Sequence, residues 1–489
     1  MKFKNTLLII LLLAFHFMQS QQTTFEYLHR SSFDAMMSDI TESDSRQVYI
    51  SIYSNAFQLD SLTNSTIIHL NEFGDRIKQK LLFIEDRDFV GNNLFTLDNG
   101  HLSIIGSYSQ KANQFMNAGI ALISLDSGFV QTALLTYNFP INRKLRGIHT
   151  TKQADGRYIT GGGLIYEEIT PPFRPIIYEF GPEYDSLKAK YFLVPNEGGH
   201  LKYMRSLDTN IYWGINYLFD RYHLFDKNLN LIETQNWKAG FGANSSCKWD
   251  TDTSFYLLGQ RVSSNNYYDL GVIRQYHPMD TTGSKHFTWH PSDTIDFPAL
   301  WAGIDLKHRD TVYLGGTRNL SFDNPYFGMQ PSWFIIVQTD SALNVRWERF
   351  YGGDAYYVMT NVLAAKDGGC FVGGSRYDYI NISELKRDVI LLKLSKEGLI
   401  VGGNELASPS LSEAIVYPNP GSDMLQIRVA FQHPISLVTL FDLGGKMVLL
   451  QHINGREAVI NTTGLGAGTY IYVITAQTGL HETGKWVKQ

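Results

Sequence analysis

Three kinds of residue in this sequence have the chemistry of functional sites: histidines, paired carboxylates and tryptophans. A zinc site needs three or four ligands that converge in space, and a nucleophilic serine is often carried by a Gly-x-Ser-x-Gly turn. The sequence contains no such turn, and its histidines show no His-x-Glu-x-x-His-like spacing. We therefore predict no metal site, no cofactor and no catalytic residue. The histidines considered are His149, His200, His223, His277, His286, His290 and His308.

Paired carboxylates and clustered glycines occur in short polar segments. Asp250-Thr251-Asp252 opens like a calcium loop, but it lacks glycine at the sixth position and glutamate at the twelfth, so we predict a turn. Glu167-Glu168 and the pair Asp86 and Asp88 are interpreted as solvated loop charges, because acid–base catalysis needs carboxylates that converge. Gly161-Gly162-Gly163 lacks the Lys and Ser/Thr of a phosphate-binding loop.

The tryptophans admit two interpretations. Exposed aromatic faces at the mouth of a β-structure bind sugar rings or partner side chains. Three of the five that we considered lie at strand positions where packing would bury them, which favours a structural role. The five are Trp237, Trp249, Trp289, Trp301 and Trp347.

The elements that must position these residues follow an internal repeat. Six times, a polar or glycine-containing turn precedes an apolar strand that ends in glycine, and a second apolar strand follows. Counting an earlier, degenerate strand at Gln47–Ser54, the repeat gives seven units with a period of about 54 residues, which is typical of propeller blades. We predict an all-β fold in which residues 21–403 form a seven-bladed β-propeller. Each glycine should mark a close backbone approach or a bend near the crowded propeller axis; the six are Gly106, Gly161, Gly214, Gly259, Gly315 and Gly373.

The two ends of the repeat array are incomplete. After Val389–Leu394 only a short apolar segment remains before Gly402-Gly403, so the last unit lacks its outer strand. Phe25–Leu28 precedes the first complete unit and belongs to no unit of its own. An unpaired strand edge exposes backbone donors and acceptors, so we predict that Phe25–Leu28 pairs with Val389–Leu394 and closes the ring.

The last residues of the chain form a separate, strand-rich segment. Tyr417-Pro418-Asn419-Pro420 fixes two φ angles and removes two backbone donors, which indicates a rigid entry into a new domain. In Met424–Ala430 apolar and polar residues alternate, as in a half-buried strand. About six short strands follow the entry, so residues 413–489 are predicted to form a small antiparallel β-sandwich, with residues 404–412 as a linker.

Four landmarks in this segment resemble the type A carboxy-terminal sorting domain of the type IX secretion system, and the region before it resembles the propeller-like repeats often found ahead of such domains. A carbohydrate-binding or immunoglobulin-like appendage is the alternative. The resemblance implies export across the Gram-negative periplasm, recognition by an outer-membrane translocon, removal by a sorting protease, and a secreted or cell-surface location. The residues that carry it are Tyr417, Pro418, Asn419, Pro420, Asp442, Gly444, Gly445, Lys446, Leu465, Gly468, Tyr470, Lys485 and Lys488.

The amino terminus and the composition agree with export. Two lysines precede a short apolar run from Leu7 to Phe15, so residues 1–20 are predicted to be a signal peptide, and no later stretch is long enough to span a membrane. The net charge of −5 and the absence of a basic tract argue against a nucleic-acid partner. Cys247 and Cys370 are too few for a disulfide framework. Cys370 is interpreted as a core residue, and a bridge between the two is the alternative.

The sequence therefore predicts a signal peptide, a propeller, a linker and a sorting domain. We interpret the propeller as an extracellular binding scaffold for a glycan or protein ligand. The alternative is a secreted polysaccharide hydrolase or lyase with its site in the propeller mouth, because propellers support both kinds of function.

Overall fold

The computed structural model shows an all-β chain that divides into two compact units, residues 1–403 and 404–489. The predicted signal peptide and linker lie outside the described residues and stay predictions. The structure describes residues 23–55, 63–97, 100–110, 118–138, 144–165, 173–181, 187–191, 201–208, 210–216, 221–236, 246–262, 268–278, 285–288, 294–381, 384–400, 414–429, 435–442, 446–455, 457–476 and 481–489.

The described residues of the first unit form seven antiparallel sheets. Sheets one to four comprise β2 (Asp34–Glu42), β3 (Val48–Asn55), β4 (Asn64–Leu70) and β5 (Arg76–Leu82); β6 (Arg87–Thr96), β7 (Leu102–Gln110), β8 (Gly119–Leu125) and β9 (Gln131–Asn138); β10 (Lys144–Lys152), β11 (Tyr158–Ile165), β12 (Phe173–Phe180) and β13 (Leu187–Tyr191); and β14 (Leu201–Ser206), β15 (Ile211–Asn216), β16 (Arg221–Asp226) and β17 (Leu231–Asn236).

The other three sheets differ more from one another. Sheet six has a divided first strand, and sheet seven takes its fourth strand from the amino terminus. They comprise β18 (Ser246–Trp249), β19 (Ser254–Val262), β20 (Tyr268–Tyr276) and β21 (Lys285–Thr288); β22 (Phe297–Pro298), β23 (Ile304–His308), β24 (Thr311–Arg318), β25 (Trp333–Thr339) and β26 (Val345–Gly352); and β27 (Tyr356–Ala364), β28 (Cys370–Tyr377), β29 (Asp388–Leu394) and β1 (Phe25–His29).

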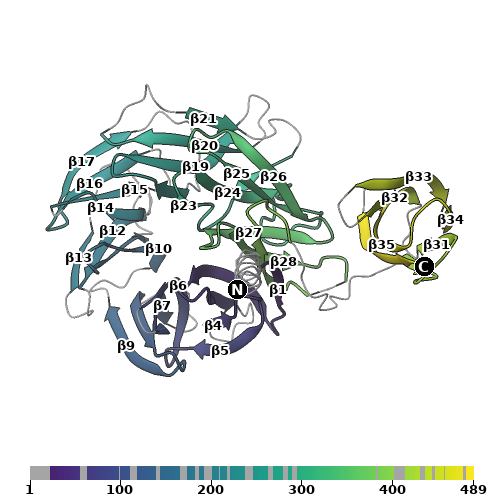
Figure 1. Cartoon of the computed structure of the whole chain (residues 1–489). Coiled ribbons are helices and arrows are strands. Elements are labelled where there is room, and N and C mark those ends of the chain that lie inside the picture. Colours follow the sequence, from purple (N-terminus) through teal and green to yellow (C-terminus); the bar gives the residue numbers. More distant parts are fainter. Residues whose placement is uncertain are drawn as a thin grey trace, which may run out of the picture. The chain divides into compact units, whose positions relative to one another are not determined.

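The sheets follow one another around a common centre in chain order (Figure 1). The first strand of each sheet contacts the first strand of the next, in the order β2, β6, β10, β14, β18, β23 and β27, and β27 contacts β2 again. Packing successive sheets through their first strands in a closed circle is the architecture of a β-propeller. The prediction of an all-β propeller is thus confirmed.

Burial along each sheet explains why the repeat is visible in the sequence. Third strands such as β8 and β29 are packed on both faces and consist almost entirely of buried residues. Outermost strands such as β5 and β26 are largely exposed and carry charged side chains. The apolar third strands therefore mark the period most clearly, whereas outer strands are hard to distinguish from loops.

The repeated glycines do mark close approaches, but they lie within their strands and not at the ends, which corrects the prediction. Gly373 lies in the middle of β28, and a Cβ atom there would sit 2.3 Å from Met37 Sδ of the next sheet. At Gly161 in β11, it would sit 2.7 Å from the Leu201 carbonyl oxygen of the following sheet. At these two positions glycine is required because the first strand of the next sheet packs directly on the backbone, whereas at Gly106 and Gly214 the nearest atoms belong to the first strand of the same sheet.

The amino-terminal strand closes the ring as predicted. β1 pairs antiparallel with β29, from Phe25 opposite Lys393 to His29 opposite Val389. Phe25 is buried in the core that joins the first and last sheets. The last sheet thereby gains a fourth strand, and its outer edge is covered by a segment from the opposite end of the repeat array.

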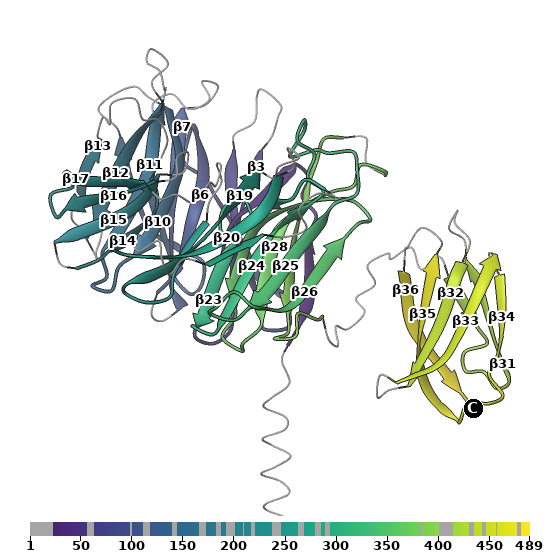
Figure 2. The same cartoon turned by 90° about the horizontal axis from the view of Figure 1, so that it is seen from above.

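The second unit is an antiparallel sandwich of two sheets, as predicted. Its core contains apolar side chains of both sheets and is completed by Trp486, which is fully buried. The four strands of the larger sheet lie side by side in Figure 2. The sheets comprise β30 (Ala414–Tyr417), β31 (Met424–Val429) and β34 (Glu457–Asn461); and β33 (Met447–Gly455), β32 (Ile435–Asp442), β35 (Gly468–Ala476) and β36 (His481–Lys488).

Removing residues 21–30 should destabilise the propeller from its last sheet. The truncation removes about three or four backbone hydrogen bonds of about 0.5–1.5 kcal/mol each and the burial of Phe25, which contributes roughly 1.5–3 kcal/mol. We expect a lower melting temperature and faster amide exchange in β29 before other strands. A chain lacking only residues 21 and 22 is the control; a truncation of residues 21–30 that melts like this control would contradict the proposed role of β1.

Candidate functional site

A pocket of about 800 Å³ lies where the first strands of six sheets converge. We call it the axial pocket. At least one polar residue from each of these six sheets lines it: Asp39 of β2, His149 of β10, Tyr203 of β14, Lys248 of β18, Asp305 of β23 and Asn361 of β27. Apolar residues, among them Ile40, Met204, Ile304 and Val362, and further polar ones form the rest of the lining.

Bulges in the first strands place several of these residues. The pairing register shifts immediately before Asp39, His149 and Asn361, so each is the first paired residue after an irregularity. A bulge bends a strand and changes the direction of the side chain that follows. Bulges leave little trace in a sequence, so the spacing of the histidines along the chain does not predict which residues come together here.

Polar side chains at these positions also join neighbouring sheets. Asp39 Oδ2 accepts a 2.8 Å hydrogen bond from the Leu94 N–H, and His149 Nδ1 accepts one of 3.3 Å from the Tyr203 N–H. Between the sixth and seventh sheets, Asp305 Oδ2 accepts a 2.8 Å bond from the Ala364 N–H. Each side chain thus satisfies a backbone donor on the first strand of the following sheet, which is an edge strand of that sheet.

Burial changes the charges around the axial pocket. It raises the pKa of the Asp39 carboxyl to about 7, although hydrogen bonds from Leu94, Ile40 and Asn93 oppose the shift. Burial, helped by Lys202 and Lys248, lowers the pKa of His149 to about 3. This imidazole is therefore neutral at pH 7, and because Nδ1 accepts the Tyr203 N–H, the proton resides on Nε2.

The pKa values of two lysines near the pocket shift in opposite directions. Burial lowers the pKa of Lys202 to about 7. Asp305 raises the pKa of Lys248 above its ordinary value, and the two groups form an ion pair with an N–O distance of 2.6 Å. The ammonium of Lys248 is thus matched by a carboxylate inside the pocket.

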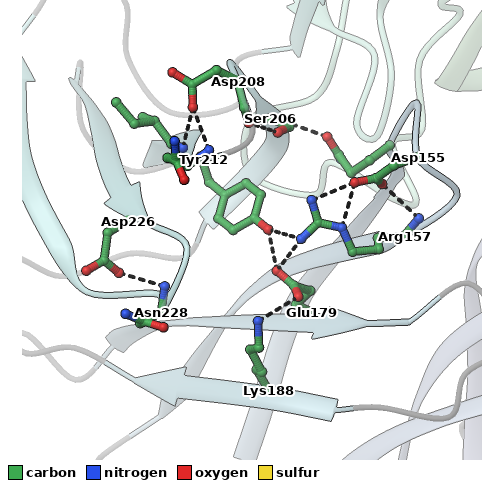
Figure 3. Close-up of polar contacts among 12 residues, drawn as sticks. Asp155, Arg157, Glu179, Lys188, Ser206, Asp208, Tyr212, Asp226 and Asn228 are labelled. Atoms are coloured by element: carbon green, nitrogen blue, oxygen red, sulfur yellow. Dashed lines mark hydrogen bonds and ion pairs between the residues drawn. The ribbon is translucent and has the colours of Figure 1, made fainter.

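The entrance of the pocket is braced by a charged network between the third and fourth sheets (Figure 3). Arg157 lies 2.6 Å from the Asp155 carboxylate and donates a 2.5 Å hydrogen bond to the Tyr212 hydroxyl. Glu179 accepts from Tyr212 and lies 3.2 Å from Arg157. Asp155 and Arg157, which line the pocket, therefore form an ion pair with each other, and Arg157 also contacts Tyr212 and Glu179 of the neighbouring strands.

The other carboxylates of the pocket are also engaged. Asp252 pairs with Arg205 at 2.7 Å, and Asp208 caps a turn by accepting the Asn210 and Ile211 N–H groups. Like Asp208, Asp39 accepts only from uncharged donors among the described groups, but Asp208 is exposed, whereas burial raises the pKa of Asp39. In the part of the chain that the structure describes, no group of three or more His, Cys, Asp or Glu residues is arranged to hold a metal ion.

Trp301 has a structural role on the axis. Its indole N–H donates to the Met37 carbonyl of the first sheet at 3.0 Å. Its carbonyl accepts from the Tyr203 hydroxyl of the fourth sheet, and its N–H donates to Thr360 O of the seventh. The segment between β22 and β23 thereby ties three other sheets together.

Packing also accounts for the other described tryptophans. Trp249 and Trp347 pack against hydrophobic cores, in agreement with the structural interpretation. The guanidinium of Arg205 lies 4.4 Å from the centroid of the Trp249 ring and covers it. Trp237 and Trp289 lie outside the described residues.

The remaining sequence candidates have structural roles or fall outside the described residues. Asp250 forms a 2.8 Å ion pair with Arg274 in a turn. Cys247 and Cys370 are both buried and free, so the alternative of a bridge between them is wrong. Glu167-Glu168 lies outside the described residues.

In the second unit, the structure brings the first and last landmarks together. Asn419 donates from Nδ2 to the Lys485 carbonyl at 2.8 Å and accepts the Val487 N–H at 2.9 Å. The Trp486 indole N–H donates to the Pro418 carbonyl at 2.8 Å. The Tyr417–Pro420 segment therefore packs along β36, and residues more than sixty positions apart form one structural element.

The other landmarks support the ends of strands. Lys488 Nζ donates to the carbonyls of Ser422 and Thr462 at 2.6 and 2.8 Å. Asp442 accepts the Lys446 N–H at 3.0 Å across a hairpin whose Gly444 and Gly445 lie outside the described residues. Leu465 packs against the core, and Tyr470, in the strand that Gly468 begins, donates its hydroxyl proton to the Gly466 carbonyl.

Comparison with known families identifies this second unit. The family described as secretion system C-terminal sorting domain matches residues 415–489. These residues are a type IX secretion sorting domain. Such a domain marks proteins that are secreted or anchored at the cell surface. The chain is therefore a secreted or cell-surface protein. Among the described residues, none forms a helix with the length and hydropathy needed to cross a membrane.

Other comparisons are less informative. No curated protein sequence matches the chain. Similar solved structures include a streptogramin B lyase (11% identity, TM-score 0.43, covering 76% of this chain and 99% of that one) and the WD40 domain of SCAP from fission yeast (8%, 0.39, 76% and 98%). A third is the polysaccharide lyase Uly1 (8%, 0.41, 73% and 90%). Because these TM-scores are below 0.5, the propeller assignment rests on strand pairing and not on these similarities.

Asp39 should make stability depend on pH. An aspartate whose pKa is raised in the folded state stabilises the protein below its unfolded pKa of about 4, and this contribution is lost as pH rises through about 7. Relative to wild type, Asp39→Asn should therefore gain about 3 kcal/mol of unfolding free energy between pH 4.5 and pH 8. Urea unfolding at both pH values measures this difference. Glu85→Gln, at an exposed site, is the control; equal pH dependence in wild type and Asp39→Asn would contradict the shift.

Proposed function

We propose that this chain is exported through the type IX secretion system by residues 413–489 and that its seven-bladed propeller is an extracellular binding scaffold. The observation that carries the proposal is the family match of residues 415–489, joined to a propeller with a pocket on its axis. An outer-membrane translocon and a sorting protease are the expected partners of the sorting domain.

The assembled landmarks support a role for the folded sorting domain, not merely for a linear tag. Tyr417–Pro420 and β36 form one surface through Asn419, and Lys488 holds β36 against the loop after Pro420. A translocon that reads this surface would distinguish a completed chain from one that lacks its last strand. We propose this surface as the recognition element.

Binding is favoured over catalysis by the charges of the axial pocket. Glycoside hydrolysis requires a proton donor and a second carboxylate acting as base or nucleophile. Asp39, with its raised pKa, has the property of a proton donor. Asp155, Asp252 and Asp305, however, are each paired with a cation. The arrangement therefore fits recognition of a ligand better than cleavage.

Transfer of the sorting domain should transfer export. Deleting residues 413–489 should leave the propeller in the periplasm, and fusing the same residues to an otherwise periplasmic carrier should bring the carrier to the cell surface or medium. Fractionation followed by immunoblotting measures both. The control is the same fusion without its last eight residues, which form most of β36. Normal export of the deleted chain would overturn the proposal.

The exported form should lack the sorting domain. We expect a cut within Ala407–Ala414, because a polar segment containing proline enters a protease more readily than a hydrogen-bonded strand does. Mass spectrometry of the surface form should find its carboxy terminus in this segment. Finding Gln489 as the terminus would contradict removal of the domain.

A further inference from the structure

We propose that the axial pocket binds an uncharged saccharide, whose hydroxyl groups pair with Asn361, His149 and Asp39. This inference rests on the proposed function of the propeller as a binding scaffold and names the class of its ligand.

Asn361 is the first reason to expect a ligand in this pocket. Asn361 is one of the residues that line the pocket, it is only 2% exposed, and its buried Oδ1 has no hydrogen-bond partner among the described groups. A buried acceptor without a partner costs about 1–3 kcal/mol. A donor supplied by a bound molecule would offset that cost, and such polar atoms are usually satisfied when the natural partner is present.

His149 and Asp39 add groups of complementary type. His149 uses Nδ1 to accept the Tyr203 N–H, so Nε2 carries the proton and is the ring nitrogen left to donate. Each Asp39 carboxyl oxygen accepts one backbone N–H, and the Asn93 side chain donates to the carboxyl as well, which leaves capacity for one further bond. The amide, imidazole and carboxyl together offer both donors and acceptors, as the hydroxyls of a sugar require.

The balance of charge favours an uncharged ligand. Inside the pocket, the Lys248 ammonium is matched by Asp305, and Asp39 is close to half protonated at neutral pH. At the entrance, Arg157 and Arg205 are matched by Asp155 and Asp252 (Figure 3 shows the Arg157 network). Lys152 and Asp208, which also line the pocket, carry opposite charges, so the lining as a whole has no large excess of one sign that would select an acidic or a basic ligand.

Size and wall chemistry fit the same class. A volume of about 800 Å³ lies within the range of small-ligand sites and admits a short oligosaccharide end. Ile40, Met204, Ile304 and Val362 supply apolar surface for the C–H face of a sugar ring. The pocket thus combines apolar walls with a few polar groups that fix orientation, as ligand pockets generally do.

The test uses purified chain, residues 21–489, and two panels of oligosaccharides. One panel is neutral, built from glucose, mannose, galactose or N-acetylglucosamine; the other contains uronic acids. We expect binding to at least one neutral member by calorimetry. Asn361→Leu should weaken this binding about tenfold or more while leaving the melting temperature equal or higher, because it removes an unpaired buried acceptor.

Asn64→Leu is the matched control. Asn64 also carries a buried Oδ1 without a partner, but it lies in β4, away from the axial pocket, so its replacement should leave saccharide binding unchanged. Neutral saccharides that bind wild type and Asn361→Leu equally would overturn the assignment to this pocket. Binding of uronates alone, lost in Asn361→Leu, would overturn the uncharged class and leave the scaffold standing. Binding of neither panel would overturn the inference, while the export experiments decide the role of the sorting domain separately.

Discussion

The ring of sheets depends on one buried ion pair at the seam between its first and last sheets. Arg387 donates from Nε and Nη2 to the two carboxylate oxygens of Asp34 at 2.7 and 2.5 Å, and its backbone N–H donates to the same carboxylate. Both side chains are almost fully buried. Removing one partner of such a pair leaves an uncompensated buried charge, at a cost of about 3–5 kcal/mol. Separating the first and last sheets would therefore cost free energy, and the closed ring with Asp34 paired to Arg387 is favoured.

The other seams use weaker versions of the same principle. Asp39, Asn93 and His149 each accept a backbone N–H from the following sheet, so polar side chains near the axis connect sheets that otherwise meet through apolar packing. Asp39 and His149 also line the pocket. His149 shows how one residue serves both purposes, since one ring nitrogen joins two sheets while the proton on the other can serve a ligand. Structural and binding roles are thus not alternatives at these positions.

The sequence predicts the architecture because the sheets repeat along the chain. It does not predict the pocket, because the residues that line the pocket differ from one sheet to the next. Glycines such as Gly373 recur because each sheet packs on the backbone of its neighbour, and Phe25–Leu28 was recognisable as a strand without a unit. In contrast, Asp39, His149 and Asn361 occupy comparable places after bulges but differ in type. No spacing rule links them, and only the convergence of strands shows that they belong together. The sorting domain was recognisable because its landmarks are short and ordered, although their assembly around Asn419 required the fold.

The seam also has a consequence for biosynthesis. Asp34 and Arg387 are 353 positions apart, so the first strands to leave the ribosome lack their partners until nearly the whole propeller has been made. Contacts at such sequence separation form slowly, since a long loop must be closed before they contribute. During this interval the Asp34 carboxylate of β2 lacks its partner Arg387, and the first sheet lacks the last sheet as its neighbour. The seam cannot form until Arg387 has been made, and a chain interrupted at any point before it remains an open arc.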